Sequence, residues 1–202
     1  MSYYADLKGR AKLAYYRNRE KIWALYPKLS ERIEEYYHEL IINEGRAAGI
    51  DESSRVLLIG AGATPYTAVT LAREFGCHVT GIDKDLIAVL LARLYLRRKA
   101  PQLDIKMRYG NGLSFKVDDF DVIVIVLHAK PKERILRAIS ESSTRNLTVI
   151  LRNPRGKYVH MYEEMKTSLS DIKFILRTTL KHPEPYRFNT LILEKYGSQI
   201  YR

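Results

Sequence analysis

Cysteine is almost absent from this chain, since Cys77 is the only one among 202 residues. A single cysteine excludes an intramolecular disulfide and a metal site built from clustered thiolates of one chain. The five histidines are scattered along the sequence and do not predict a metal site either. We therefore expect no bound metal.

Long hydrophobic runs are also missing. The longest apolar stretch, Leu86 to Leu96, is interrupted by Arg93 and is shorter than the roughly 20 residues that a membrane-spanning helix needs. No early segment combines a basic head, an apolar run and a cleavage-like tail. We expect a soluble, cytoplasmic protein without a membrane partner.

Acidic residues are fewer than basic ones, and the formal net charge is +11. Residues 1–32 contain eight Lys or Arg against three acids, and residues 145–157 contain four against none. Such patches can bind nucleic acid, with Arg152, Arg155 and Lys157 as candidate phosphate contacts. A solvated surface or an anionic small substrate explains the surplus equally well, so nucleic acid stays one of three interpretations.

The first 50 residues have helical periodicity. Apolar residues recur at three- and four-residue spacing from Leu7 to Leu25 until Pro27 interrupts the pattern, and Ser30 can cap a second helix. We expect residues 1–50 to form an N-terminal helical extension and residues 51–202 to form the main domain. The extension could cover the site or form a homodimer interface.

Glu44 stands out in the second predicted helix. It falls on the apolar stripe, seven residues after Tyr37 and four after Leu40. A carboxylate on a face that is predicted to be buried requires a partner or a function.

From residue 55 onward, short apolar runs alternate with helical patterns, which is typical of a parallel sheet covered by helices. The predicted strands are residues 56–60, 78–83, 104–110, 120–128 and 146–154. Two further strands, residues 172–180 and 186–196, have no helix between them and should pair antiparallel. Five strand-and-helix units and a terminal hairpin resemble the class I methyltransferase order. The predicted fold is therefore α/β and Rossmann-like, with a seven-stranded, mostly parallel sheet preceded by helices.

A glycine loop follows the first predicted strand. Its residues, Gly60, Ala61, Gly62 and Ala63, let backbone N–H groups approach a ligand, and Thr64 can cap the next helix. The third glycine of the dinucleotide fingerprint is absent, which weakens pyrophosphate binding. S-adenosylmethionine has no phosphate, so we predict it as the cofactor; a ligand-free strand-to-helix turn is the alternative.

Other strand ends supply further cofactor candidates. Asp83 ends the second strand, where a carboxylate can accept hydrogen bonds from both ribose hydroxyls, and Lys84 follows it. Asp83 could instead cap the next helix. Asn111 and Gly112 follow the third strand, where this fold places a polar residue beside the adenine, although Asn-Gly is also a good turn. His128 ends the fourth strand as a cofactor contact, a base or a structural histidine.

Three motifs together resemble nicotianamine synthase and its archaeal and bacterial metallophore-synthase relatives, over about Tyr37 to Glu194. They are Tyr37, Leu40 and Glu44 before the first strand, GAGATPYTAVTLA at residues 60–72, and HPEPYRFNT at residues 182–190. The resemblance implies transfer of the 3-amino-3-carboxypropyl group of S-adenosylmethionine, instead of its methyl group, to an amine.

The resemblance also implies residue roles. Glu44 becomes a catalytic candidate for holding or deprotonating the acceptor amine. The alternative is a helix-end carboxylate that pairs with Arg46 or is exposed by fraying. Tyr66 is a second catalytic candidate. His182 and Asn189 match the closing motif as hairpin-forming residues or as part of the active-site wall. The N-terminal region is shorter than the helical domain of the plant enzymes.

Three functions fit the sequence. The first is a transferase that acts on a small amine or amino acid. The second is a methyltransferase of a small molecule or of RNA, whose affinity for RNA would fall steeply with salt. The third is a cofactor-binding protein without catalytic activity.

Overall fold

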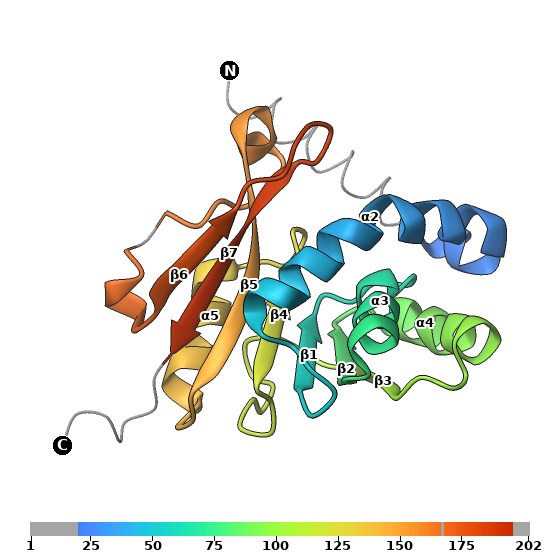
Figure 1. Ribbon diagram of the computed structural model, residues 1–202, viewed down its shortest axis with the longest axis horizontal. Coiled ribbons are helices and arrows are strands. Elements are labelled where there is room, and N and C mark those ends of the chain that lie inside the picture. The colour runs from blue at the N-terminus through green and yellow to red at the C-terminus, as the bar shows by residue number, and fades with distance from the viewer. Residues whose placement is uncertain (1–19, 167, 196–202) are drawn as a thin grey trace.

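The computed structural model describes residues 20–166 and 168–195 and contains one seven-stranded sheet in the order β3-β2-β1-β4-β5-β7-β6 (Figure 1). The strands are β1 (Arg55–Ile59), β2 (His78–Asp83), β3 (Ile105–Tyr109), β4 (Val122–Ile125), β5 (Leu147–Pro154), β6 (Ile175–Leu180) and β7 (Phe188–Lys195). The helices are α2 (Pro27–Ala48), α3 (Tyr66–Phe75), α4 (Leu86–Lys99) and α5 (Lys132–Ser142), with 3-10 turns at Gly156–His160 and Ser170–Ile172.

The direction of the strands confirms the predicted fold class. β1 pairs in parallel with β2 and β4, β2 pairs in parallel with β3, and β4 pairs in parallel with β5. β7 pairs antiparallel with both β5 and β6. The four residues of β4 are all buried, as expected for a central strand that is covered on both faces.

The core forms two layers because successive side chains of a strand point to opposite faces of the sheet. Val56 and Leu58 of β1 pack into one hydrophobic cluster, together with residues of α2, α3 and α4. Leu57 and Ile59 pack into the other cluster, with α5. Figure 1 shows α2 and α3 in front of the sheet and α5 behind it.

Two connections differ from the predicted strand-and-helix units. The described segment between β3 and β4, residues 110–121, contains no helix, and β5 is followed by a short 3-10 turn. Residues 110–121 include two glycines and three aspartates, which favour turns over helix. Only β1, β2 and β4 are followed by an α-helix in the described residues.

The start of α2 also differs from the prediction. The helix begins at Pro27 with Tyr26 as its N-cap, so Ser30 is not the cap. Proline is tolerated there because the first turn of a helix needs no N–H donor. Residues 20–25 are helical as well, whereas the rest of the predicted first helix lies outside the described residues. No helix among the described residues is long and apolar enough to cross a membrane.

Candidate functional site

A cavity opens at the carboxyl ends of the parallel strands and has a volume of about 360 Å³. β1 lies between β2 and β4, so the cavity occupies the point where the strand order reverses, which is the usual ligand site of an open α/β sheet. Eight of the nine predicted cofactor residues line it: Gly60, Gly62, Ala63, Asp83, Lys84, Asn111, Gly112 and His128. The ninth, Ala61, does not line the cavity and is buried.

The glycine loop is folded tightly over the end of β2. The backbone N–H groups of Gly60 and Ala61 both donate to the Ile82 carbonyl, at 2.9 and 3.0 Å. Gly60 has a φ of 85°, and a Cβ added there would lie 2.8 Å from Cγ2 of Val126. Only glycine fits this position, because both the backbone conformation and the contact with Val126 exclude a side chain.

Thr64 does not cap α3 as predicted. The N-cap is Pro65, and no side chain accepts a hydrogen bond there. The Thr64 hydroxyl donates instead to Oε1 of Glu20, at 3.3 Å. The loop is therefore held by a contact from the N-terminal region.

Asp83 is fixed at the cavity by the backbone around it. Its Oδ2 accepts from the Gly62 N–H at 3.0 Å, and its Oδ1 accepts from the Asp85 N–H at 2.9 Å. Asp85 is the cap of α4, because its side chain accepts from the N–H groups of Ile87 and Ala88. The capping function therefore falls to Asp85, and Asp83 faces the cavity.

Residues that follow β3 and β4 also line the cavity. Oδ1 of Asn111 accepts from the Leu113 N–H at 3.1 Å, so Asn111 forms a turn and lines the cavity at once. The His128 ring lies edge-on to the Tyr162 ring, with centroids 5.0 Å apart, and both residues line the cavity. Tyr162 lay outside the sequence motifs.

Glu20 and Lys21 also line the cavity, and no sequence motif singled out either residue. Oε1 of Glu20 accepts from the N–H groups of Ala63 and Thr64, at 3.0 and 3.3 Å. Burial raises the pKa of Glu20 to about 7, and the nearby Asp83 carboxylate adds to this increase. The Lys21 ammonium forms an ion pair with Asp85 at 2.5 Å.

The predicted catalytic residue Glu44 is in a sealed cluster and does not line the cavity. Its carboxylate is 1% exposed and is paired with Arg152, which is 2% exposed. Nη2 of Arg152 donates to Oε2 at 2.7 Å, Nε donates to Oε1 at 3.1 Å, and the Thr190 hydroxyl donates to Oε1 at 2.6 Å. The partner is therefore Arg152, and the alternative pairing with Arg46 is wrong.

Tyr66 belongs to the same cluster and does not line the cavity either. Its ring stacks on that of Tyr37, with centroids 5.2 Å apart and an interplanar angle of 15°. Burial strongly raises the pKa of Tyr66, and the Tyr37 hydroxyl adds to this effect. The Tyr66 hydroxyl therefore remains protonated and can donate a hydrogen bond.

The closing motif forms the hairpin turn, which is the first of its two predicted roles, and its residues do not line the cavity. Oδ1 of Asn189 accepts from the His182 N–H at 3.3 Å, which holds the turn between β6 and β7. Nε2 of His182 lies 2.9 Å from the Thr190 hydroxyl that contacts Glu44. Burial lowers the pKa of His182. The motif thus connects the hairpin to the Glu44 cluster.

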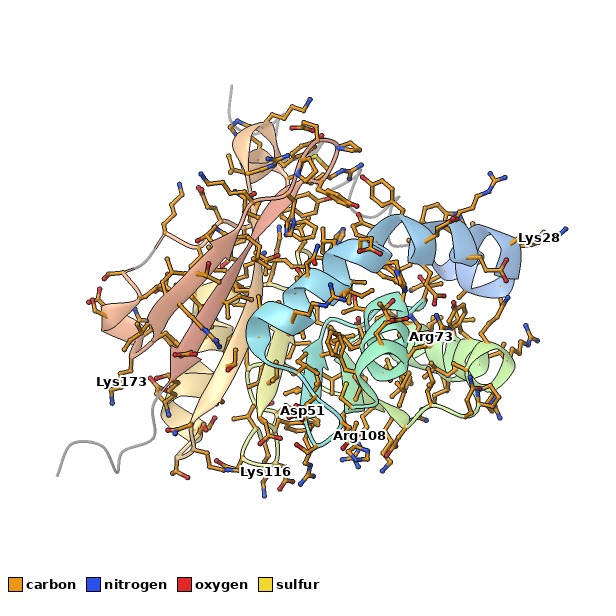
Figure 2. The ribbon with its side chains drawn as sticks, in the orientation of Figure 1. Lys28, Asp51, Arg73, Arg108, Lys116 and Lys173 are labelled. Atoms are coloured by element: carbon orange, nitrogen blue, oxygen red, sulfur yellow. The ribbon has the colours of Figure 1, made fainter. Side chains whose placement is uncertain are left out.

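Most of the predicted basic patch in residues 1–32 lies outside the described residues. Figure 2 shows Lys28, Lys116 and Lys173 at separate edges of the molecule. Arg152 is buried and Nη2 of Arg155 lies 3.4 Å from the Glu184 carboxylate. The predicted phosphate contact by Arg152 is therefore wrong, because its guanidinium already neutralises Glu44.

Comparison with known proteins identifies relatives in sequence and in structure, although no family model matches. The chain is 31% identical over 164 residues to the L-histidine 2-aminobutanoyltransferase of Pseudomonas aeruginosa, a match that covers 79% of this chain and 60% of the relative. The protein of the same name from Yersinia pestis is 26% identical over 121 residues, which cover 59% of this chain and 45% of that protein. The chain thus spans less than two thirds of these curated relatives.

Solved structures agree with the fold. A mutant of MtNAS in complex with S-adenosylmethionine has a TM-score of 0.73 and 18% identity, over 89% of this chain and 72% of that chain. An RNA methyltransferase from Salinibacter ruber, in complex with S-adenosyl-L-homocysteine, has a TM-score of 0.57 and 15% identity, over 78% and 89%. MtNAS is a nicotianamine synthase, so the predicted resemblance is confirmed. The chain has the Rossmann-like class I methyltransferase fold and is similar in sequence to the L-histidine 2-aminobutanoyltransferases.

Proposed function

We propose that this chain is an S-adenosylmethionine-dependent transferase that moves the 3-amino-3-carboxypropyl group to an amine of a small acceptor. The observation that carries the proposal is the cavity at the carboxyl ends of β1 and β2, with a glycine loop on one side and Asp83 on the other. Likeness to aminobutanoyltransferases over 79% of the chain supports the reaction type.

The cavity residues fit this cofactor. A volume of about 360 Å³ falls within the range of small-molecule sites. Asp83 presents a carboxylate that can accept hydrogen bonds from two ribose hydroxyls, and the backbone already fixes its orientation. Gly62 has a φ of 71°, which disfavours any side chain, and a Cβ added there would meet the Glu20 carboxylate.

When bound, S-adenosylmethionine supplies three electrophilic carbons on a sulfonium. In the proposed reaction, the acceptor nitrogen forms a bond to the γ-carbon of the methionine portion as the bond from that carbon to sulfur breaks. The electron pair stays on sulfur, so 5′-methylthioadenosine leaves as a neutral thioether, and the nitrogen releases a proton. The chain selects this carbon by fixing the orientation of the two reactants.

We assign the acceptor side to the cluster of Glu44 and Tyr66. The Arg152 ion pair keeps the Glu44 carboxylate in one position, and Tyr66 offers a protonated hydroxyl. This role requires the cluster, which is closed in the structure, to open toward the cavity. Glu44 would then hold the acceptor amine or accept its proton, and Tyr66 would orient it. The relatives' name makes L-histidine the first acceptor to test, and an amino acid the proposed substrate class.

The test is to incubate the purified chain with S-adenosylmethionine and a panel of L-histidine, other amino acids, polyamines and RNA. Mass spectrometry then identifies the nucleoside product. We expect 5′-methylthioadenosine with an amino acid acceptor. S-adenosylhomocysteine would instead establish methyl transfer, and an intact cofactor with every acceptor would contradict a catalytic function.

Methyl transfer to a small molecule or to RNA is the second candidate. The fold likeness to an RNA methyltransferase favours it. With RNA, binding should weaken steeply as salt rises, because released counterions drive such association. Salt-independent catalysis with a free amino acid would exclude RNA as the substrate.

A homodimer also remains a prediction, which sedimentation of the purified chain can test.

A further inference from the structure

Glu20 is a cavity residue that the proposed reaction leaves without a role. It lies in the helical stretch 20–25, far in sequence from the glycine loop. Ala24 of that stretch is buried against Ala63 and Ala88, so packing places the stretch on the loop and on α4. The position of Glu20 at the cavity follows from this contact.

The Glu20 carboxylate lies directly on the glycine loop. The three hydrogen bonds that Glu20 accepts from described residues all reach the same oxygen, Oε1, and come from the Ala63 N–H, the Thr64 N–H and the Thr64 hydroxyl. A Cβ added to Gly62 would be 2.0 Å from Oε1 and 3.2 Å from Oε2. Among the described residues, none donates a hydrogen bond to Oε2, so this oxygen can accept hydrogen bonds from a ligand in the cavity.

No cation of the described chain forms an ion pair with this carboxylate. The neighbouring Lys21 pairs with Asp85, and Asp83 contributes a second negative charge close to Glu20. A half-buried carboxylate without a cation is unfavourable. A positively charged ligand group would supply the missing partner.

We propose that Glu20 binds the α-ammonium group of the methionine portion of S-adenosylmethionine, while Asp83 binds the ribose. This inference rests on the proposed function, because the cavity must hold the cofactor along the glycine loop between these two carboxylates. Charge-assisted hydrogen bonds between carboxylate and ammonium are among the strongest in proteins. Glu20 is thereby a cofactor-binding residue that fixes the end of the cofactor that is transferred.

The experiment measures the affinity of three nucleosides for the purified wild-type chain and for Glu20→Gln by calorimetry. S-adenosylmethionine and S-adenosylhomocysteine both carry the ammonium group, whereas 5′-methylthioadenosine lacks the whole amino acid portion. We expect Glu20→Gln to weaken the first two by about 10-fold and to leave 5′-methylthioadenosine unchanged. Glu35→Gln, which removes one exposed carboxylate from α2, is the matched charge control and should change none of the three.

Each other outcome overturns the inference. Unchanged affinity for S-adenosylmethionine, or tighter binding, would mean that Glu20 only holds the loop or competes with the cofactor. An equal loss for 5′-methylthioadenosine would indicate a general structural defect. A loss for S-adenosylmethionine alone would point to the sulfonium. If the wild-type chain binds none of the nucleosides, the proposed function fails. If the wild-type chain produces 5′-methylthioadenosine but Glu20→Gln binds S-adenosylmethionine as tightly as the wild type, only the assignment of Glu20 fails.

Proton release gives an independent measurement. Thr64 donates to Glu20, the carboxylate of Asp83 and the hydroxyl of Tyr66 interact with it electrostatically, and Lys21, which pairs with Asp85, is adjacent in sequence. Its pKa is about 7, and a bound ammonium would lower that pKa by favouring the ionised carboxylate. Binding of S-adenosylmethionine at pH 6.5 should therefore release protons in the wild type, and Glu20→Gln should release fewer. Calorimetry in buffers of different ionisation enthalpy measures the difference.

Discussion

Two carboxylates, Glu20 and Glu44, come from neighbouring helical segments but lie in opposite environments. Glu44 is sealed in the interior, where Arg152 neutralises it and Thr190 donates a further hydrogen bond. Glu20 lines the cavity beside a second carboxylate and has no described cation as partner. The difference teaches that burial alone does not set the role of a carboxylate. Glu44 must open its contacts with Arg152 and Thr190 before it can bind an acceptor, whereas Glu20 already faces the cavity.

Breaking the Glu44 pair should have the largest effect. Glu44→Gln leaves the Arg152 guanidinium buried without a counter-charge, which costs about 3–5 kcal/mol of the free energy of unfolding. Denaturant unfolding measures this loss. The double variant Glu44→Gln, Arg152→Met should recover most of it, and failure to recover would mean that the pair is not the source of the cost.

This stability effect also limits how a catalytic test of Glu44 can be read. Turnover of Glu44→Gln should be measured at a temperature where unfolding data show the variant folded. There, the affinity for S-adenosylmethionine should change little while turnover falls by about 100-fold or more, if Glu44 holds or deprotonates the acceptor. Unchanged turnover would assign Glu44 to folding alone.

Asp83 should give the next largest effect, on binding instead of stability. Asp83→Asn removes the charge that accepts from the ribose hydroxyls, so affinity for S-adenosylmethionine and 5′-methylthioadenosine should fall together, by roughly 10- to 100-fold. Calorimetry measures both, and a thermal melt checks folding. Equal affinities in the variant and the wild type would reject the ribose assignment. This parallel loss contrasts with Glu20→Gln, which should weaken the affinity for S-adenosylmethionine and leave that for 5′-methylthioadenosine unchanged.

The pH dependence sharpens the same contrast. Because the pKa of Glu20 is about 7, affinity for a ligand with an ammonium group should rise as pH increases from about 6 to about 8 and the carboxylate ionises. In Glu20→Gln this rise should be lost, and 5′-methylthioadenosine should show little dependence in either chain. A rise that persists in Glu20→Gln would assign the titration to another group.

The smallest effects concern two glycines with a left-handed backbone, Gly60 in the glycine loop and Gly49 at the end of α2. Gly60→Ala places a methyl group 2.8 Å from Val126 in a left-handed backbone, whereas Gly49→Ala has the same backbone strain and no atom within 4 Å. We expect a loss of about 1 kcal/mol in stability for Gly49→Ala and a larger loss for Gly60→Ala. Chemical denaturation of both variants isolates the contact with Val126. Equal losses would show that Val126 moves aside freely.

Local patterns in the sequence determined the sheet, the glycine loop and most of the residues predicted to line the cavity. β1, β2 and β5 lie close to the predicted residues because apolar runs and turn residues are written along the chain. Asp83 and Asn111 reached the cavity because the carboxyl ends of neighbouring parallel strands meet at one edge. Such features depend on adjacent residues and on one general rule of topology.

Only the tertiary structure decided the partners of the two glutamates. Glu44 and Arg152 are 108 residues apart in sequence, and Glu20 and Ala63 are 43 apart. The sequence pattern placed Glu44 on a buried face but could not select Arg152 from 34 Lys and Arg residues, and nothing marked Glu20. Pairing of distant side chains is set by how helices pack on the sheet. Hydrophobic burial drives that packing, but because it is non-directional it does not specify polar partners.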